Sequence, residues 1–101
     1  MQHFPIFLAV AGRRIVLSGG GDAALAKLRL LMKTEAQIVV FAEDAAAEIH
    51  QWAETGQLSL ISRPLRAGDT KGAALFYAAD EDATEDARTA AIATADGVLV
   101  N

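Results

Sequence analysis

The sequence predicts an α/β protein with a Rossmann-type, doubly wound parallel sheet of about five strands in the order 3-2-1-4-5. Its short apolar runs, such as Ile15–Leu17, are typical of strands that are buried on both faces of a parallel sheet. Stretches with apolar residues at helical spacing separate most of these runs. Three consecutive glycines, Gly19–Gly21, follow the first run, as in turns that lead from a strand into a phosphate-binding helix.

The first half of the chain alternates strands and helices. A run rich in strand-forming residues covers residues 4–10, and the first strand of the sheet is expected at residues 15–17. Leucines at helical spacing predict a helix over residues 22–33. The second strand is expected at residues 37–41, where the run is again apolar and β-branched.

Two local signals frame the second predicted helix. Asp44 is expected to cap a helix over residues 45–54, and Gly56 is expected to end it. The third strand is expected at residues 58–61, directly before a break at Arg63-Pro64.

The last third of the chain adds a fourth strand at residues 73–78 and a fifth at residues 98–100. A helix is expected between them, over residues 82–94. Small residues make its predicted packing face, namely Thr84, Ala87, Ala91 and Ala95. The length of 101 residues predicts one domain, residues 1–101, with a small core.

The glycine turn has the form G-x-G-x-x-A, in which each small residue has a physical task. Gly19 allows the tight turn, Gly21 leaves room for a pyrophosphate, and Ala24 lets the helix pack closely on the strand. The helix N-terminus offers free amides and a positive dipole end to the phosphates. The residues expected to contact the cofactor here are Gly19, Gly20, Gly21, Asp22, Ala23 and Ala24.

An acidic pair, Glu43 and Asp44, follows the second strand about twenty residues beyond the glycine turn. Dinucleotide-binding domains place a carboxylate there to accept hydrogen bonds from the adenosine ribose. The alternative is an ordinary strand-to-helix turn, with Asp44 as a plain N-cap. Residues 41–51 contain no Arg or Lys to pair with a 2′-phosphate, so the sequence favours NAD over NADP.

Composition excludes several other classes of function. The net charge of −4 disfavours nucleic-acid binding, and no apolar stretch is long enough to span a membrane. The absence of cysteine excludes thiolate metal sites and fits a cytoplasmic location. The two histidines, His3 and His50, have no partner at ligand spacing, so no metal site is expected.

Several pieces of the chain match one known family in order. They are Phe4-Pro5-Ile6-Phe7, Ile15 through Ala24 with Lys27, Trp52, Gly56, Ala78 through Asp82, and Asn101. On these residues the whole chain resembles the N-terminal domain of the siroheme synthases, which join precorrin-2 dehydrogenase and sirohydrochlorin ferrochelatase activities. Three residues depart from the family pattern, namely Ser18 for an apolar residue, Ala26 for an Arg, and Asp80 for a Thr.

The resemblance implies that NAD accepts a hydride from the tetrapyrrole precorrin-2 to give sirohydrochlorin, with possible insertion of ferrous iron afterwards. It implies a homodimer for the full-length protein, with the dimerisation segment and further domains beyond Asn101. The family's catalytic Asp also lies beyond the position of Asn101. No catalytic residue is therefore expected within this chain, and we expect the chain alone to be inactive.

The sequence leaves two other interpretations open. One is a non-catalytic sensory domain that binds NAD or another nucleotide, and the other is a domain that keeps the fold but binds no ligand. Lys27 either attracts phosphate or substrate carboxylates or lies on a solvated helix face. Arg88 either contacts the acidic tetrapyrrole or pairs with nearby acids such as Glu85.

Overall fold

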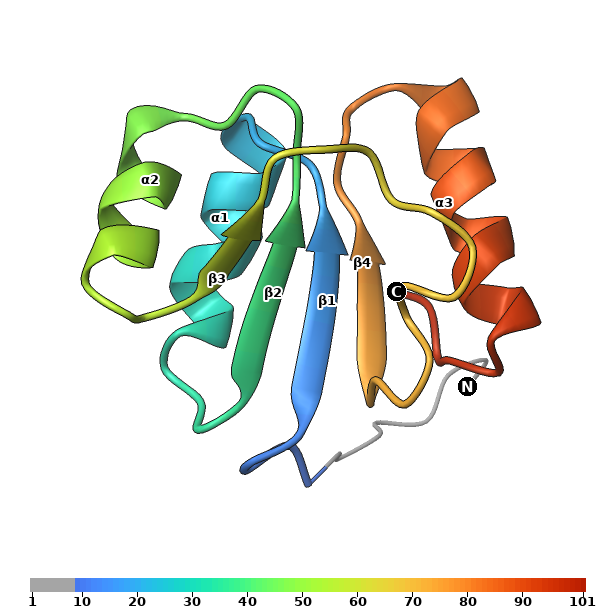
Figure 1. Ribbon diagram of the computed structural model, residues 1–101, viewed down its shortest axis with the longest axis horizontal. Coiled ribbons are helices and arrows are strands. Elements are labelled where there is room, and N and C mark those ends of the chain that lie inside the picture. The colour runs from blue at the N-terminus through green and yellow to red at the C-terminus, as the bar shows by residue number, and fades with distance from the viewer. Residues whose placement is uncertain (1–8) are drawn as a thin grey trace, which may run out of the picture.

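A computed structural model, which describes residues 9–101, confirms the predicted fold class (Figure 1). One parallel sheet has the strand order β3-β2-β1-β4. Its strands are β1 (Arg14–Ser18), β2 (Gln37–Phe41), β3 (Ser59–Ile61) and β4 (Leu75–Ala78). The helices are α1 (Asp22–Leu31), α2 (Ala47–Glu54) and α3 (Ala83–Ala95). Most of the predicted run at 4–10, with the Phe4–Phe7 segment, lies outside the described residues.

The strands run in register, so three of them end at one level. Ser18 of β1 pairs with Phe41 of β2 on one side and with Ala78 of β4 on the other. The residues that follow β1, β2 and β4 therefore meet at the carboxyl edge of the sheet, which is the upper edge in Figure 1. Residues 62–74 connect β3 to β4 without a helix and pass over the same edge.

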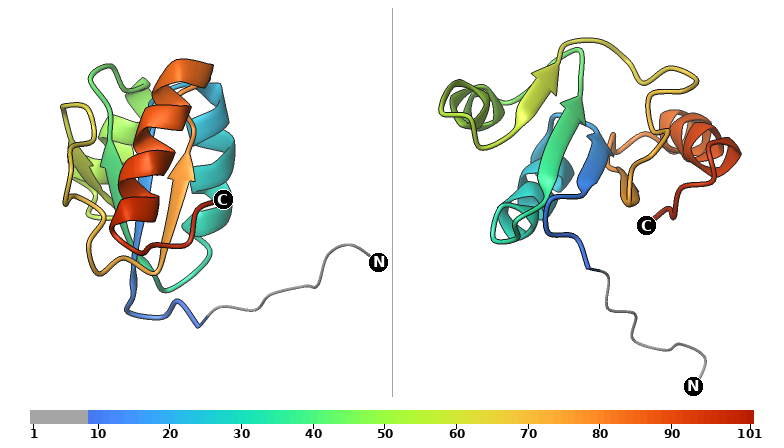
Figure 2. Two further views of the ribbon diagram at one scale, coloured as in Figure 1. Left: turned by 90° about the vertical axis from the view of Figure 1, so that its right-hand side faces the viewer. Right: turned by 60° about the horizontal axis from the view of Figure 1, so that its bottom comes forward.

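Two hydrophobic clusters hold the layers together, one on each face of the sheet. The alternation of side chains along β1 sends Ile15 and Leu17 into the cluster with α1 and α2, and Val16 into the cluster with α3. Figure 2 shows α3 separated from α1 and α2 by the strands. The sheet is therefore covered by helices on both faces, as the apolar strands predict.

The predicted fifth strand is reduced to one bridge, so the sheet of the described residues has four strands. Val100 forms a parallel bridge with Phe76, which places it beside β4 where the fifth strand is expected. Two backbone hydrogen bonds make this bridge, from Phe76 to Leu99 and from Asn101 to Phe76.

The packing face predicted for α3 is wrong. Thr89 and Ala93 are buried, whereas the predicted residues Thr84, Ala87, Ala91 and Ala95 are exposed. Alanines occur all round this helix, so its sequence contains no single apolar stripe from which the buried face is predictable.

Candidate functional site

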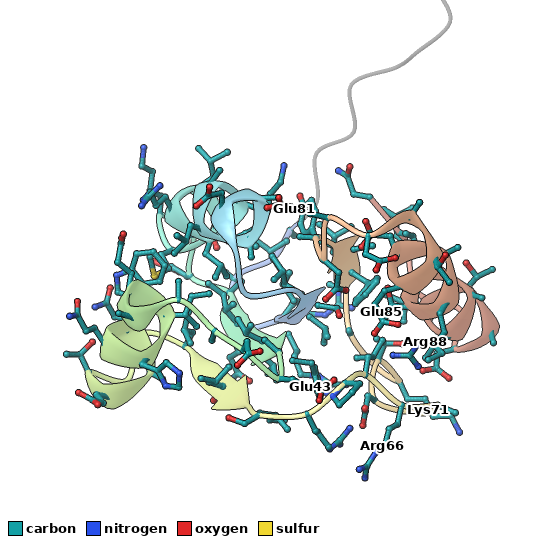
Figure 3. All side chains as sticks on the ribbon, turned by 90° about the horizontal axis from the view of Figure 1, so that it is seen from above. Glu43, Arg66, Lys71, Glu81, Glu85 and Arg88 are labelled. Carbon is teal, nitrogen blue, oxygen red and sulfur yellow. The ribbon has the colours of Figure 1, made fainter. Side chains whose placement is uncertain are left out.

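A cleft of about 560 Å³ opens at the carboxyl edge of the sheet, within the size range of small-molecule sites. It is lined by residues that follow β1, β2 and β4, together with Pro64 and the first turn of α3. Five carboxylates line it, and they belong to Glu43, Asp44, Asp80, Asp82 and Glu85. Figure 3 looks down on this edge and shows Glu43 and Glu85 near its middle.

The glycine turn, Gly19–Gly21, is pressed between two neighbouring turns. Gly19 has a φ of +137°, and a Cβ there would lie 2.1 Å from the carbonyl oxygen of Ala79. A Cβ on Gly20 would lie 2.2 Å from the carbonyl oxygen of Asp44. Packing of the protein against itself therefore requires both of these glycines.

Gly21 is different, because packing gives no reason for its missing side chain. Only a side-chain oxygen of Glu81, 3.5 Å away, comes near the position that a Cβ would take. Gly21 is exposed in the cleft, directly before the first residue of α1. Ala24, one turn further on, is fully buried. Both positions suit the tasks that the G-x-G-x-x-A pattern predicts, namely space for a pyrophosphate and close packing of the helix.

The N-terminus of α1 carries a contact that the sequence did not predict. The helix has no side-chain cap from Gly21, but the amide of Ala23 donates to Glu81 Oε1 at 2.6 Å. Glu81 comes from the acidic turn, Asp80–Asp82, which joins β4 to α3. Figure 3 shows Glu81 beside the start of α1. The two partners lie 58 residues apart in the sequence, beyond the reach of any local pattern.

The expected capping role of Asp44 is wrong. Helix α2 begins at Ala47, its N-cap is Ala46, and no side chain caps it. The amide of Ala46 instead donates to the carbonyl of Gly20 at 2.9 Å. The loop after β2 therefore lies against the glycine turn, and the helix begins only after this contact. The carboxylates of Glu43 and Asp44 are exposed in the cleft beside that turn. The structure thus removes the capping role of Asp44, and the ribose role of Glu43 and Asp44 stays a prediction.

Two departures from the family pattern contact each other. The hydroxyl of Ser18, which is 2% exposed, donates to Asp80 Oδ2 at 2.6 Å. The amide of Asp80 donates to Asp86 Oδ1 at 2.9 Å, which fixes the acidic turn on α3. Burial raises the pKa of the Asp80 carboxyl, and the Ser18 hydrogen bond opposes that rise.

Two arginines close to the cleft, Arg63 and Arg88, pair with acids. Both terminal nitrogens of Arg63 donate to Asp69, which raises the pKa of Arg63 and lowers that of Asp69, and the guanidinium lies 5.1 Å from the ring centroid of Phe41. Arg88 pairs with Glu85 through two hydrogen bonds of 2.7 Å, as the second interpretation of Arg88 expected. That pair lowers the pKa of Glu85.

Lys27 lies neither in the glycine turn nor in open solvent. Its Nζ is 4.8 Å from the ring centroid of Tyr77 on β4, in a cation–π contact. His50 is exposed on α2, and His3 lies outside the described residues. In residues 9–101, no group of three or more His, Asp or Glu residues is arranged to hold a metal ion. No helix in that range has the length and apolar character that crossing a bilayer requires.

The residues at the glycine turn fit a dinucleotide. An open glycine and a helix N-terminus offer room and amides to a pyrophosphate. Exposed carboxylates stand on the neighbouring turn, where a ribose hydroxyl would find an acceptor. Glu81 alone stands against this fit, because its carboxylate already uses one of the amides.

Comparison with known proteins also indicates a dinucleotide-binding domain. A family described as putative NAD(P)-binding matches residues 6–101. Siroheme synthases from Chromobacterium violaceum and Nitrosococcus oceani are 40% and 33% identical over all 101 residues, which confirms the resemblance over the whole chain. The chain spans 22% of the length of each of these relatives.

A solved structure has the same fold. The precorrin-2 dehydrogenase SirC superposes on 98% of this chain, with a TM-score of 0.78 and 24% sequence identity, and the match spans 48% of SirC. The family match agrees with the dinucleotide cofactor that the glycine turn predicts.

Proposed function

Because the chain belongs to the family of putative NAD(P)-binding domains, we propose that residues 1–101 form the domain that holds NAD while precorrin-2 is oxidised. One observation carries the proposal. The exposed Gly21, which no packing constraint requires, lies at the N-terminus of α1 in the same cleft as the exposed Glu43 and Asp44.

The pyrophosphate is proposed to lie over the glycine turn and the first turn of α1, where the amides of Asp22 and Ala23 point out of the helix end. The adenosine ribose then lies against Glu43 and Asp44, whose carboxylates accept its hydroxyls. Gly19 and Gly20 contribute by packing, since they bring the two neighbouring turns to this place.

NAD is the proposed form of the cofactor. A 2′-phosphate would meet the carboxylates of Glu43 and Asp44, and like charges at such a contact repel. Arg63 is the cation that stacks on Phe41 at this end of the cleft, but both of its terminal nitrogens already bind Asp69. It is therefore not free to compensate a further phosphate.

The chemistry that NAD supplies when bound is acceptance of the hydride that leaves precorrin-2. The described residues contribute orientation and electrostatics. Arg66 lies two residues beyond Pro64, which lines the cleft, and we propose that it attracts carboxylates of the tetrapyrrole (Figure 3). The cleft carboxylates favour the approach of a cation, so insertion of ferrous iron belongs to the same proposal. The proposal also places the full-length protein in the cytoplasm as a homodimer.

Calorimetric titration tests the cofactor site. NAD should bind roughly tenfold or more tightly than NADP, because the ribose carboxylates repel the additional phosphate. Gly21→Val should abolish NAD binding without unfolding the protein, since its side chain would fill the pyrophosphate's place. Ala26→Val is the matched control, because it places the same valine side chain at an exposed position of α1 and should bind NAD normally.

Each arm has its own contradicting outcome. Equal affinity for NAD and NADP would remove the ribose role of Glu43 and Asp44. Unchanged affinity in Gly21→Val would remove the pyrophosphate site. The dehydrogenase step is tested with the full-length protein. Absorbance at 340 nm, roughly where reduced nicotinamides absorb, measures the reduction of NAD by precorrin-2. Failure of that protein to reduce NAD would refute the dehydrogenase step.

A further inference from the structure

The side chain of Glu81 occupies the helix end that an anionic cofactor needs. Glu81 Oε1 lies 2.6 Å from the amide nitrogen of Ala23 and 3.5 Å from the position that a Cβ on Gly21 would take. A carboxylate and a phosphate are both anions that seek free amides and the positive end of the helix dipole. They cannot use the same amide at the same time.

We propose that Glu81 is an internal anion that closes the pyrophosphate site of the free protein and that the dinucleotide displaces when it binds. This inference rests on the proposed function, because it assigns a competitor to the same site. It makes Glu81 a determinant of cofactor affinity that neither the glycine pattern nor the comparisons identify.

The backbone around Glu81 is built to hold the side chain in this place. Glu81 has a φ of +60°, in the left-handed region that residues with a Cβ rarely adopt. Asp80 on one side is tied to Ser18, and Asp82 on the other side accepts from the amides of Thr84 and Glu85. With both neighbours anchored, the backbone of the turn is fixed.

Displacement of Glu81 then requires only rotation of its own side chain. Glu81 is exposed, so the carboxylate can move from Ala23 into water without leaving a buried charge behind. The amide of Ala23 passes to the incoming phosphate at the same time. The exchange of one anion for another therefore leaves the fold unchanged and lowers the apparent affinity by the fraction of molecules in which the site is closed.

A purely structural role makes the opposite prediction. If Glu81 served only as a remote cap of α1, its removal would lower thermal stability and leave NAD affinity unchanged or weaker. Competition predicts tighter NAD binding once the carboxylate is gone. Affinity and stability measured on the same variants therefore separate the two roles.

The test is calorimetric titration of NAD into the wild-type protein, Glu81→Ala, Glu81→Asp and the control Glu54→Ala, with thermal unfolding of each. Glu81→Asp keeps the charge but shortens the side chain by one methylene, so it loses the reach to Ala23. Glu54→Ala removes one exposed carboxylate from the last residue of α2. We expect both Glu81 variants to bind NAD about threefold to tenfold more tightly and the control to match the wild type.

The unfavourable outcomes are distinct. A gain in Glu81→Ala without a gain in Glu81→Asp would show a general charge effect and overturn displacement. Equal affinities in all four proteins would overturn the inference and leave NAD binding intact. No binding of millimolar NAD by any of the four, including the variant with the site open, would refute the proposed function and the inference with it.

Discussion

The glycine turn after β1 and the acidic turn after β4 face each other across the same edge of the sheet, and they are chemical opposites. The glycine turn offers backbone amides and no side chains. The acidic turn offers three carboxylates, and all three have partners, namely the hydroxyl of Ser18 for Asp80, the amide of Ala23 for Glu81, and the first turn of α3 for Asp82.

This comparison shows that one turn completes the other in the free protein. The close approach of Gly19 to Ala79 brings the acidic turn within reach of the amides at the start of α1. The turn that we propose to bind the anionic cofactor thus already has an anion beside it. In the proposed exchange, cofactor binding moves only the side chain of Glu81, whereas the close packing of Gly19 against Ala79 stays in place.

The largest effect expected is on the close approach itself. Gly19→Ala would place a Cβ 2.1 Å from the carbonyl oxygen of Ala79 at a φ of +137°. Steric overlap and backbone strain together should lower the free energy of unfolding by about 3 kcal/mol or more. Gly21→Ala, where the space is open, should change it by less than about 1 kcal/mol. Urea unfolding of the two variants measures the difference.

Similar losses in both variants would show that the packing of the two turns does not distinguish their glycines. A stable Gly19→Ala protein would mean that the acidic turn moves away at little cost. That result would also weaken the assignment of Glu81 to the amide of Ala23, because both contacts depend on the same approach.

Local patterns in the sequence were enough to predict the glycine turn but not the acidic turn. Strand β2 has the predicted bounds of residues 37–41, because a short β-branched apolar run between polar residues indicates a buried strand. The packing face of α3 was not predictable, since alanines surround the helix. The role of Asp44 was misassigned because the N-cap, Ala46, lies two residues beyond Asp44.

The contacts between the turns join residues 58 and 62 positions apart, so no periodicity or motif reveals them. One signal was present in the sequence. Ser18 and Asp80 both depart from the family pattern, and the predicted strand order places the ends of the first and fourth strands side by side. A hydroxyl and a carboxyl introduced at those two ends are potential hydrogen-bond partners. Glu81 gave no comparable signal, because its side chain crosses to a helix that the strand order does not locate.

A middle-sized effect is expected from the cap of α3. Asp82 accepts from the amides of Thr84 and Glu85 at 2.9 and 3.1 Å, so Asp82→Ala should cost about 1 kcal/mol of stability. Asp82→Asn keeps an acceptor oxygen and should cost only a few tenths of a kcal/mol, roughly. Thermal unfolding gives both values. If Asp82→Asn lost as much as Asp82→Ala, the negative charge rather than the cap would hold the acidic turn.

The smallest effect concerns the pH dependence of Asp80. Burial raises the pKa of its carboxyl above the ordinary value of 3.8, and the nearby Glu85 and Asp86 add to that rise, while Ser18 and Arg88 oppose it. The folded protein therefore holds this proton more tightly than the unfolded chain does. Ionisation of Asp80 costs stability, and its contribution falls as the pH rises from 3.8 through the raised pKa.

Asp80→Asn removes that step, because an amide does not titrate and still accepts from Ser18. The variant should be more stable than the wild type at pH 7, by less than about 1 kcal/mol because most of the carboxyl remains screened by water. The gain should shrink as the pH falls through 3.8, because the carboxyl then becomes protonated in the unfolded chain as well as in the folded protein. Ser18→Ala is the matching control. Loss of the hydroxyl removes a donor to the Asp80 carboxylate, so the stability lost when Asp80 ionises should be larger in this variant than in the wild type.

Chemical unfolding between pH 3.5 and 7, roughly the interval in which carboxyls titrate, measures the stability of all three proteins. Parallel stability curves for the wild type and Asp80→Asn would mean that ionised Asp80 is accommodated without cost, and that Ser18 and the water in the cleft together balance its burial.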